Sequence, residues 1–227
     1  MKTSIADNIA QVRAEITSAC QSAARAPGSV QLVAVSKTWG AEAVRAAHAV
    51  GQNDFGENYI QEAVDKITAL RDLPLVWHCI GPIQSNKTRL VAERFDWVHS
   101  IDRLKIAQRL SEQRPTELPP LQVCIQVNVD GGDTKSGVSP QELPALAQAV
   151  AVLPRLRLRG LMTIPEPAQN DAQMRAVHRQ TKDLFEQLRA QGLPLDTLSM
   201  GMSADMRAAI AEGSTLVRVG TAIFGQR

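Results

Sequence analysis

The sequence contains little cysteine, and the cysteines present follow no recognisable pattern. Cys20, Cys79 and Cys124 are spread along 227 residues, without the close spacings found in metal sites or disulfide frameworks. The four histidines are equally scattered. We therefore expect no metal site, and a reducing compartment, the cytoplasm.

Long apolar runs and blocks of like charge are also missing. No apolar stretch approaches the roughly 20 residues that a membrane span requires, and Met1–Ser4 leads into an amphipathic segment rather than a secretory signal. The 25 basic and 23 acidic side chains leave a net charge of only +2. This balance argues against nucleic acid or a membrane as a partner.

The sequence also lacks a domain linker, a low-complexity segment and an internal repeat of fixed period. No GxGxxG motif follows the first predicted strand, which weakens a dinucleotide-binding interpretation. The hydrophobic content of 44% is sufficient for a full core. We expect residues 1–227 to form one domain.

What the chain does contain is a regular alternation of short apolar runs with amphipathic segments. Ser4–Ala24 has helical spacing, with Ser4 as a cap. Eight predicted strands follow, ending at residues 36, 55, 80, 101, 129, 164, 200 and 219. Strict alternation indicates a parallel sheet. Eight units favour a closed (β/α)8 barrel with an extra N-terminal helix, and an open doubly wound sheet is the alternative.

The chain is organised around its first predicted strand, Leu32–Lys37, which is aliphatic on both faces and ends in a lysine. Such a strand is typical of a parallel sheet buried on both sides. A buried ammonium is costly, so Lys37 either reaches solvent or is used chemically. Taken alone, the solvent-reaching interpretation is the commoner one.

Other notable side chains follow the ends of further predicted strands. Asn58 comes just after the second strand, His78 lies near the end of the third, and Met162 and Met200 lie at the ends of the sixth and seventh. In a barrel, the carboxyl ends of all strands open on one face, which holds the site. Separately, each residue also has an ordinary interpretation as a core or surface residue.

The last two loops have the chemistry of a phosphate site, which barrels often place there. Ser203 is expected to cap a helix over residues 204–212, with its hydroxyl facing an anion. Gly220 and Thr221 repeat this pattern after the last strand, beside Arg218. Phosphate-binding loops opposite Lys37 suggest an aldehyde ligand that carries a phosphate and forms a Schiff base.

Seven segments together resemble a known family over essentially the whole chain. They are LVAVSK (32–37), FGENYIQE (55–62), WHCIGPIQSNK (77–87), VNVDGGDTKSGV (127–138), RGLMTIP (159–165), LSMGMSADM (198–206) and VRVGTAIFG (217–225). The sequence resembles the pyridoxal 5′-phosphate (PLP) homeostasis proteins, whose barrel is similar to the N-terminal domain of alanine racemase. One mild departure is the loop Asp130–Asp133, where many members carry a glutamate.

The resemblance implies PLP as the cofactor and a role for each matched residue. Lys37 matches the lysine that forms the internal aldimine. Ser203, Gly220 and Thr221 match phosphate-binding positions, and Arg218 matches the arginine that faces the pyridine nitrogen. The remaining matches are motif residues near the cofactor, Asn58 and His78, and residues along its ring or phosphate end, Met162 and Met200.

The same residues argue against conventional catalysis. A permanent cation at Arg218 keeps the pyridine nitrogen unprotonated and the ring a poor electron sink. The only tyrosine is Tyr59, and the chain stops at Arg227, so we expect no second acid/base group of the kind that an extra β domain supplies in the racemase. The resemblance implies a monomer acting in vitamin B6 homeostasis, with indirect effects on amino-acid and keto-acid metabolism, and apo PLP-enzymes as cofactor acceptors. The alternatives are a weak racemase or lyase and a Schiff-base aldolase barrel.

Overall fold

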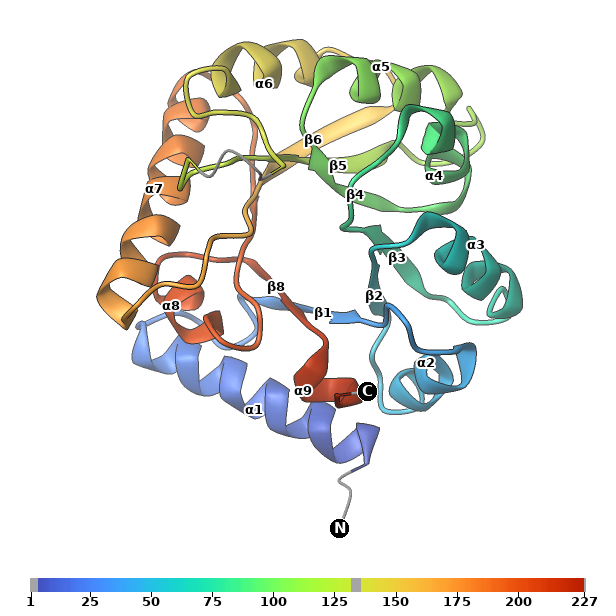
Figure 1. The fold of residues 1–227 in the computed structure, drawn as a ribbon, viewed down its shortest axis with the longest axis vertical. Coiled ribbons are helices and arrows are strands. Elements are labelled where there is room, and N and C mark those ends of the chain that lie inside the picture. Colours follow the sequence, from blue (N-terminus) through green and yellow to red (C-terminus); the bar gives the residue numbers. More distant parts are fainter. Residues whose placement is uncertain (1–3, 132–135, 227) are drawn as a thin grey trace.

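A closed barrel of parallel strands forms the centre of the computed structural model, and helices surround it (Figure 1). The structure describes residues 4–131 and 136–226. In chain order, the strands are β1 (Gln31–Val35), β2 (Asp54–Glu57), β3 (Val76–Cys79), β4 (Trp97–Ile101), β5 (Leu121–Gln126), β6 (Leu156–Met162), β7 (Thr197–Ser199) and β8 (Leu216–Val219). Each pairs with the next, and β8 pairs with β1 in parallel. This closure confirms the barrel and rules out the open sheet.

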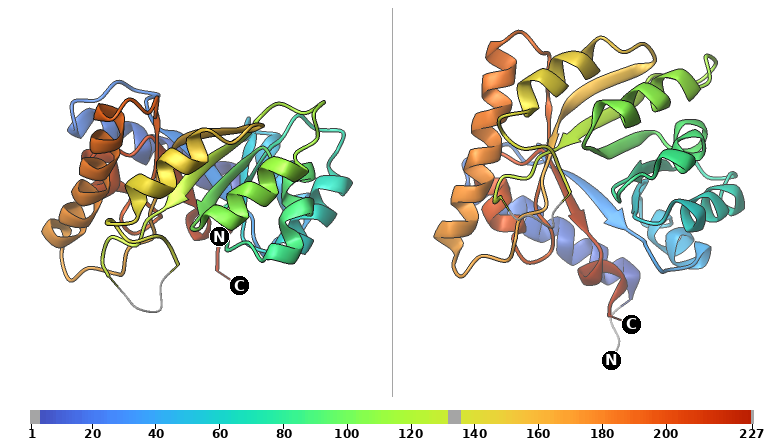
Figure 2. Two further views of the ribbon diagram at one scale, coloured as in Figure 1. Left: turned by 90° about the horizontal axis from the view of Figure 1, so that it is seen from above. Right: turned by 45° about the horizontal axis from the view of Figure 1, so that its top comes forward.

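The helices form an outer layer that packs on the strands. They are α1 (Ile5–Ser22), α2 (Ala41–His48), α3 (Ile60–Ala69), the 3-10 turn η1 (Ser85–Lys87), α4 (Thr88–Arg94), α5 (Leu104–Gln113), α6 (Leu143–Ala151), α7 (Asp171–Ala190), α8 (Met206–Ala211) and α9 (Thr221–Phe224). Figure 2 shows this layer from two further directions. The core between the layers is apolar, as expected for parallel strands covered by helices.

The predicted extra helix, α1, is present and begins at a cap formed by Ser4. It packs against α8, α9 and α2 (Figure 1), and the Asn8 amide donates a hydrogen bond to the Ile223 carbonyl at 2.8 Å. Because α9 has only four residues, it is too short to cover the outside of β8 and β1. We infer that α1 takes the place of a full-length last helix.

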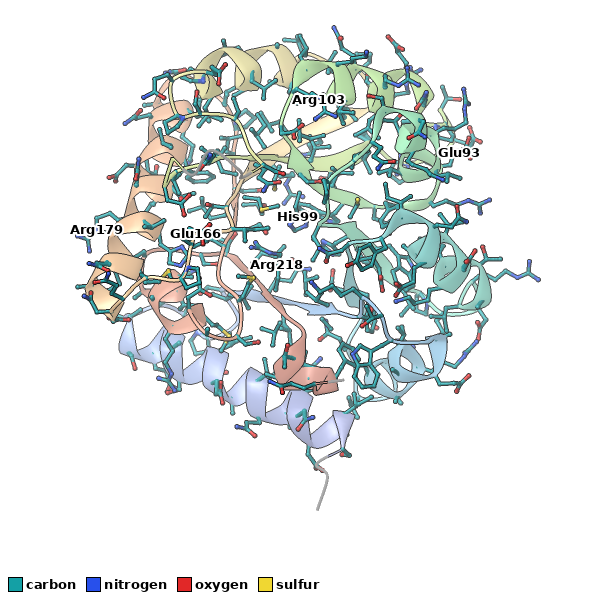
Figure 3. All side chains as sticks on the ribbon, viewed as in Figure 1. Glu93, His99, Arg103, Glu166, Arg179 and Arg218 are labelled. Atoms are coloured by element: carbon teal, nitrogen blue, oxygen red, sulfur yellow. The ribbon has the colours of Figure 1, made fainter. Side chains whose placement is uncertain are left out.

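The interior of the barrel is unusually polar for this fold, in which branched apolar side chains normally fill that space. His78, His99, Ser199 and Arg218 are all buried. Figure 3 shows His99 and Arg218 at the centre of the ring of helices, whereas Glu93 and Arg179 lie at its outer edge. The polar interior directly underlies the carboxyl-terminal face of the strands.

The scarce cysteines are buried singly and unpaired. Burial raises the pKa of Cys79 and of Cys124 to about 12, so both thiols are protonated at neutral pH. Within residues 4–131 and 136–226, no group of three potential metal ligands lies close enough to hold an ion. In the same residues, no helix has the length and apolar character needed to cross a membrane.

Candidate cofactor site

A cavity of about 830 Å³ opens at the carboxyl-terminal face of the barrel, where the loops after several strands meet. Six of the nine predicted site residues line it: Lys37, Asn58, Ser203, Arg218, Gly220 and Thr221. They come from the ends of β1, β2, β7 and β8, which are distant in sequence but adjacent in the closed barrel. The structure therefore brings the lysine and the two expected phosphate loops to one cavity.

Lys37 lies in a tight turn that begins where β1 ends. The next residue, Thr38, has a positive φ of 65°, a left-handed conformation that is strained for a β-branched side chain. The Thr38 N–H donates to the Glu62 carboxylate at 2.6 Å, which holds the turn to α3. This strained, anchored turn presents the exposed Lys37 side chain to the cavity.

A second lysine, Lys66, is buried beneath this turn and is fully engaged. Its ammonium lies 2.7 Å from the Ser36 carbonyl, 2.5 Å from Glu57 and 2.8 Å from Glu62. Three acceptors match its three protons, so Lys66 is held as an ammonium between two carboxylates. Across the described part of the chain, the Lys37 amine has no such ion pair. Lys37, which is exposed and lines the cavity, therefore stays the predicted nucleophile.

Glu57 completes this buried cluster and was missed by the sequence reasoning. Its Oε1 accepts from the Ser36 hydroxyl at 2.6 Å as well as from Lys66. Burial raises the pKa of Glu57, although Lys66 and Ser36 oppose that rise. Its place in the FGENYIQE segment was the only sequence signal, because a strand-end glutamate alone suggests a surface charge. The cluster supports the Lys37 turn from below.

The loop after β7 differs from the prediction for Ser203. This residue does not cap a helix, because α8 begins only at Met206 and Asp205 occupies the cap position. The Asp205 carboxylate instead accepts the Met202 N–H at 2.7 Å and bonds Nε2 of the buried His178 at 2.9 Å. These two contacts hold residues 202–205 as a turn, which leaves the exposed Ser203 on the cavity wall.

Two glycines allow the backbone to approach closely beside this cavity. Gly201 has a φ of +99°, and a Cβ there would lie 2.7 Å from the Ala209 methyl group. A Cβ on Gly220 would lie 3.2 Å from the Val35 carbonyl oxygen. Larger residues would therefore displace either the β7 loop or the end of β8.

Arg218 is a buried cation on the cavity wall, with only 3% of its surface exposed. Its guanidinium donates to the Ser199 hydroxyl at 2.7 Å and to the Thr163 carbonyl at 2.9 Å. Within the described residues it forms no ion pair with a carboxylate. Burial lowers the pKa of Arg218 to about 10, so it remains charged at neutral pH and lacks a counter-ion.

Asn58 is the second polar group in the cavity with unused capacity. Its side-chain Oδ1 is buried and has no hydrogen-bond partner in the part of the chain that the structure describes. A buried carbonyl oxygen without a donor is costly. The cavity wall thus offers a cation, an amine and an unpaired acceptor.

Three predicted residues lie outside this lining. His78 lies inside the barrel, bonded to Asp54 and His99, and Met162 and Met200 are completely buried. Met162 is the last residue of β6 and Met200 directly follows β7, whereas Met202, further along the loop after β7, lines the cavity. None of the three lines the cavity, and their contact with a cofactor stays a prediction. Residues 132–135 of the VNVDGGDTKSGV segment lie outside the described residues.

The buried side chain of His99 leads to a prediction about how the free energy of unfolding depends on pH. Burial, then His78 and Arg218, hold the pKa of His99 well below its ordinary 6.5, so the unfolded chain binds a proton that the folded chain does not. We expect the free energy of unfolding to fall as pH drops below about 6.5, with a slope approaching about 1.4 kcal/mol per pH unit from this group. Urea unfolding curves recorded between about pH 7.5 and 5.5 give the free energy of unfolding at each pH, and hence this slope.

The controls for this measurement are two matched histidine substitutions. His99→Asn should lose this part of the pH dependence, whereas His48→Asn, on the outer helix α2, should keep it. If the slopes of wild type and His99→Asn coincide, His99 is not the group responsible.

The fold and the cavity define a class: a (β/α)8 barrel with a cavity at the carboxyl-terminal face, lined by a lysine that follows β1 and by residues that follow β7 and β8. A family model described as the N-terminal domain of alanine racemase matches residues 5–227. An alanine racemase from Corynebacterium glutamicum shares the fold, with a TM-score of 0.72 and 22% identity over 98% of this chain and 62% of the racemase.

Relatives of higher sequence identity indicate a more specific family within this class. A pyridoxal phosphate homeostasis protein from Pseudomonas aeruginosa PAO1 is 62% identical over 225 residues, covering 99% of this chain and 96% of the relative. The structure of PipY from Synechococcus elongatus PCC7942, with PLP bound, has a TM-score of 0.86 and 40% identity, covering 97% of this chain and 100% of PipY. The chain belongs to the family of pyridoxal phosphate homeostasis proteins, within the alanine racemase N-terminal domain fold.

Proposed function

We propose that this protein binds PLP in the cavity at the carboxyl-terminal face, holds it as a Schiff base on Lys37, and serves the homeostasis of that cofactor. One observation carries the proposal: a single cavity joins the available amine of Lys37 to the buried, unpaired cation of Arg218. The names of the relatives support it, as does PipY, which was solved with PLP bound.

The unused groups of the cavity match those of PLP. The Lys37 amine suits the aldehyde, and Arg218 suits the pyridine nitrogen as a donor-only partner. Ser203, Gly220 and Thr221 surround a position for the phosphate on the walls contributed by β7 and β8. The Asn58 oxygen suits a hydroxyl donor. A volume of about 830 Å³ is in the range of small-molecule sites.

The residues favour holding the cofactor over turnover. PLP supplies an electrophilic aldehyde and a ring that withdraws electrons most strongly when its nitrogen is protonated. Arg218 donates hydrogen bonds and retains its own proton, since its pKa, lowered to about 10, is still far above neutral. Tyr59 does not line the cavity and is 57% exposed, so it is poorly placed as a second acid.

The wider role follows from these features. We infer a cytoplasmic, monomeric carrier that releases PLP to apo PLP-enzymes and thereby affects amino-acid and keto-acid metabolism. The buried, unpaired thiols support a reducing compartment. The alternative is a weak racemase or lyase, which the shared fold with alanine racemases keeps as a candidate.

Incubation of the PLP-loaded protein with L-alanine in deuterated water tests carrier against enzyme. We expect no sustained deuterium incorporation at Cα, because loss of a positioned acid or base alone costs about 10²–10⁴-fold in rate. NMR of the recovered alanine measures incorporation, and an apo PLP-enzyme added to a parallel sample measures release of PLP. Multiple turnovers that disappear in Lys37→Ala would establish an enzyme and overturn the carrier proposal.

A further inference from the structure

Five side chains form one hydrogen-bonded chain across the barrel interior. Nε2 of His78 lies 3.0 Å from Asp54 Oδ1, and Nδ1 of His78 lies 3.0 Å from Nε2 of His99. Nδ1 of His99 lies 2.7 Å from the Ser199 hydroxyl, which accepts from Arg218 at 2.7 Å. The residues come from β2, β3, β4, β7 and β8, and Figure 3 shows His99 and Arg218 in the middle of the barrel.

This chain, which we call the interior relay, joins the two ends of the barrel. Arg218 lines the cavity at the carboxyl-terminal face. Asp54 is the first residue of β2 and lines a separate groove at the amino-terminal ends of β1 and β2. The Asp54 side chain is 21% exposed, whereas the four other members are buried. Only the Asp54 end is therefore accessible to solvent outside the cavity.

The Asp54 end determines the direction of each hydrogen bond. A carboxylate only accepts, so His78 donates to Asp54 from Nε2. A neutral His78 then accepts at Nδ1, and His99 must donate to it from Nε2. A neutral His99 in turn accepts at Nδ1 from the Ser199 hydroxyl. The Ser199 oxygen is thereby left to accept from the donor-only guanidinium of Arg218.

The surroundings of the relay favour this neutral arrangement. The Trp97 ring stacks on His78 at 5.5 Å between centroids and lies 5.9 Å from His99. Burial, together with the charge of Arg218, holds the pKa of His99 well below 6.5. Among the described residues, the neighbouring charged or titratable groups include Cys124 and Asp205, which act on Arg218 through space, and Arg159, whose guanidinium lies 4.8 Å from the centroid of the Trp97 ring.

We propose that His99 and Ser199 are positioning residues for Arg218, and that His78 and Asp54 maintain their hydrogen-bond direction from the opposite end of the barrel. The expected effect on PLP binding rests on the proposed function. The Ser199 oxygen is then always presented as an acceptor to one terminal guanidinium nitrogen, while the Thr163 carbonyl accepts from the other. Only the N–H groups that these two bonds do not use are left for the cavity. A change at Asp54, which lines no part of that cavity, will then alter how PLP is bound.

The first test needs no cofactor. Imidazole ¹⁵N chemical shifts of the apo-protein report which nitrogen of each histidine carries the proton. We expect the Nε2–H form alone for both His78 and His99 at neutral pH. In Asp54→Ala the terminal acceptor is gone, so both tautomers should appear. Asp54→Glu, which restores a carboxylate, should return the histidines to the Nε2–H form.

The second test uses the cofactor. We expect Ser199→Ala to weaken PLP binding about tenfold, and Asp54→Ala about threefold to tenfold, since a hydrogen bond to a charged group is lost or misdirected. Both should also shift the absorption of bound PLP. Asp72→Ala is the matched control, because Asp72 is 54% exposed and pairs only with Arg45 among the described residues.

Two results would overturn the inference. One is a wild-type His99 that carries its proton on Nδ1 at neutral pH. The other is an Asp54→Ala protein with wild-type tautomers and wild-type PLP affinity. If the wild-type protein binds no PLP at all, the proposed function fails, but the tautomers of the apo-protein still decide the direction of the relay.

Discussion

Lys37→Ala is expected to abolish covalent attachment of PLP. The loaded wild-type protein should be yellow, with a visible band that borohydride reduction removes and fixes on one lysine. The amine of Lys37 is available at the cavity, whereas Lys66 is held as an ammonium by Glu57 and Glu62 and is a poor nucleophile. The variant should lack the band, yet retain weaker binding through the phosphate contacts.

Absorption spectra before and after reduction, followed by peptide mapping of the labelled lysine, measure this effect. Lys105→Ala is the control, because Lys105 lies exposed on the outer helix α5. Its spectrum and labelling should match those of wild type. A label found on Lys66, or on any lysine other than Lys37, would refute the assignment.

Removal of the ligand phosphate is expected to have the second large effect. Pyridoxal should bind about 10²–10⁴-fold more weakly than PLP, because it forgoes two or more charge-assisted hydrogen bonds worth roughly 1.5–3 kcal/mol each. Ser203 and Thr221 offer hydroxyl donors at the cavity wall. Ser203→Ala should therefore weaken PLP binding about tenfold and leave pyridoxal binding nearly unchanged.

Fluorescence or calorimetric titration of both ligands against wild type and variant separates these effects. Ser22→Ala is the matched control, since Ser22 is exposed at the end of α1 and bonds only the Ser18 carbonyl among the described residues. Equal affinities for PLP and pyridoxal would show that no phosphate site exists in this cavity.

Local chemistry made most of the fold predictable from sequence, and six of the nine predicted site residues line one cavity. Aliphatic runs such as Leu32–Val35 are typical of strands buried on both faces, and their strict alternation with helices leads to a parallel barrel. The strand ends then place Lys37, Asn58 and Arg218 at one face, and they do line one cavity. Helix limits were less predictable, as Ser203 shows, because Asp205 and His178 hold a turn that delays α8.

Only the tertiary structure decided which strand residues meet inside the barrel. A strand buried on both faces has no polar side to reveal its orientation, so nothing in the sequence separates an inward His78 from one that reaches a ligand. The interior relay needs side chains from five strands, and the parallel pairing of β8 with β1 closes the barrel around it. Sequence alone determined the barrel and the place of Lys37 at the end of β1, whereas the partners of Arg218 followed from barrel closure.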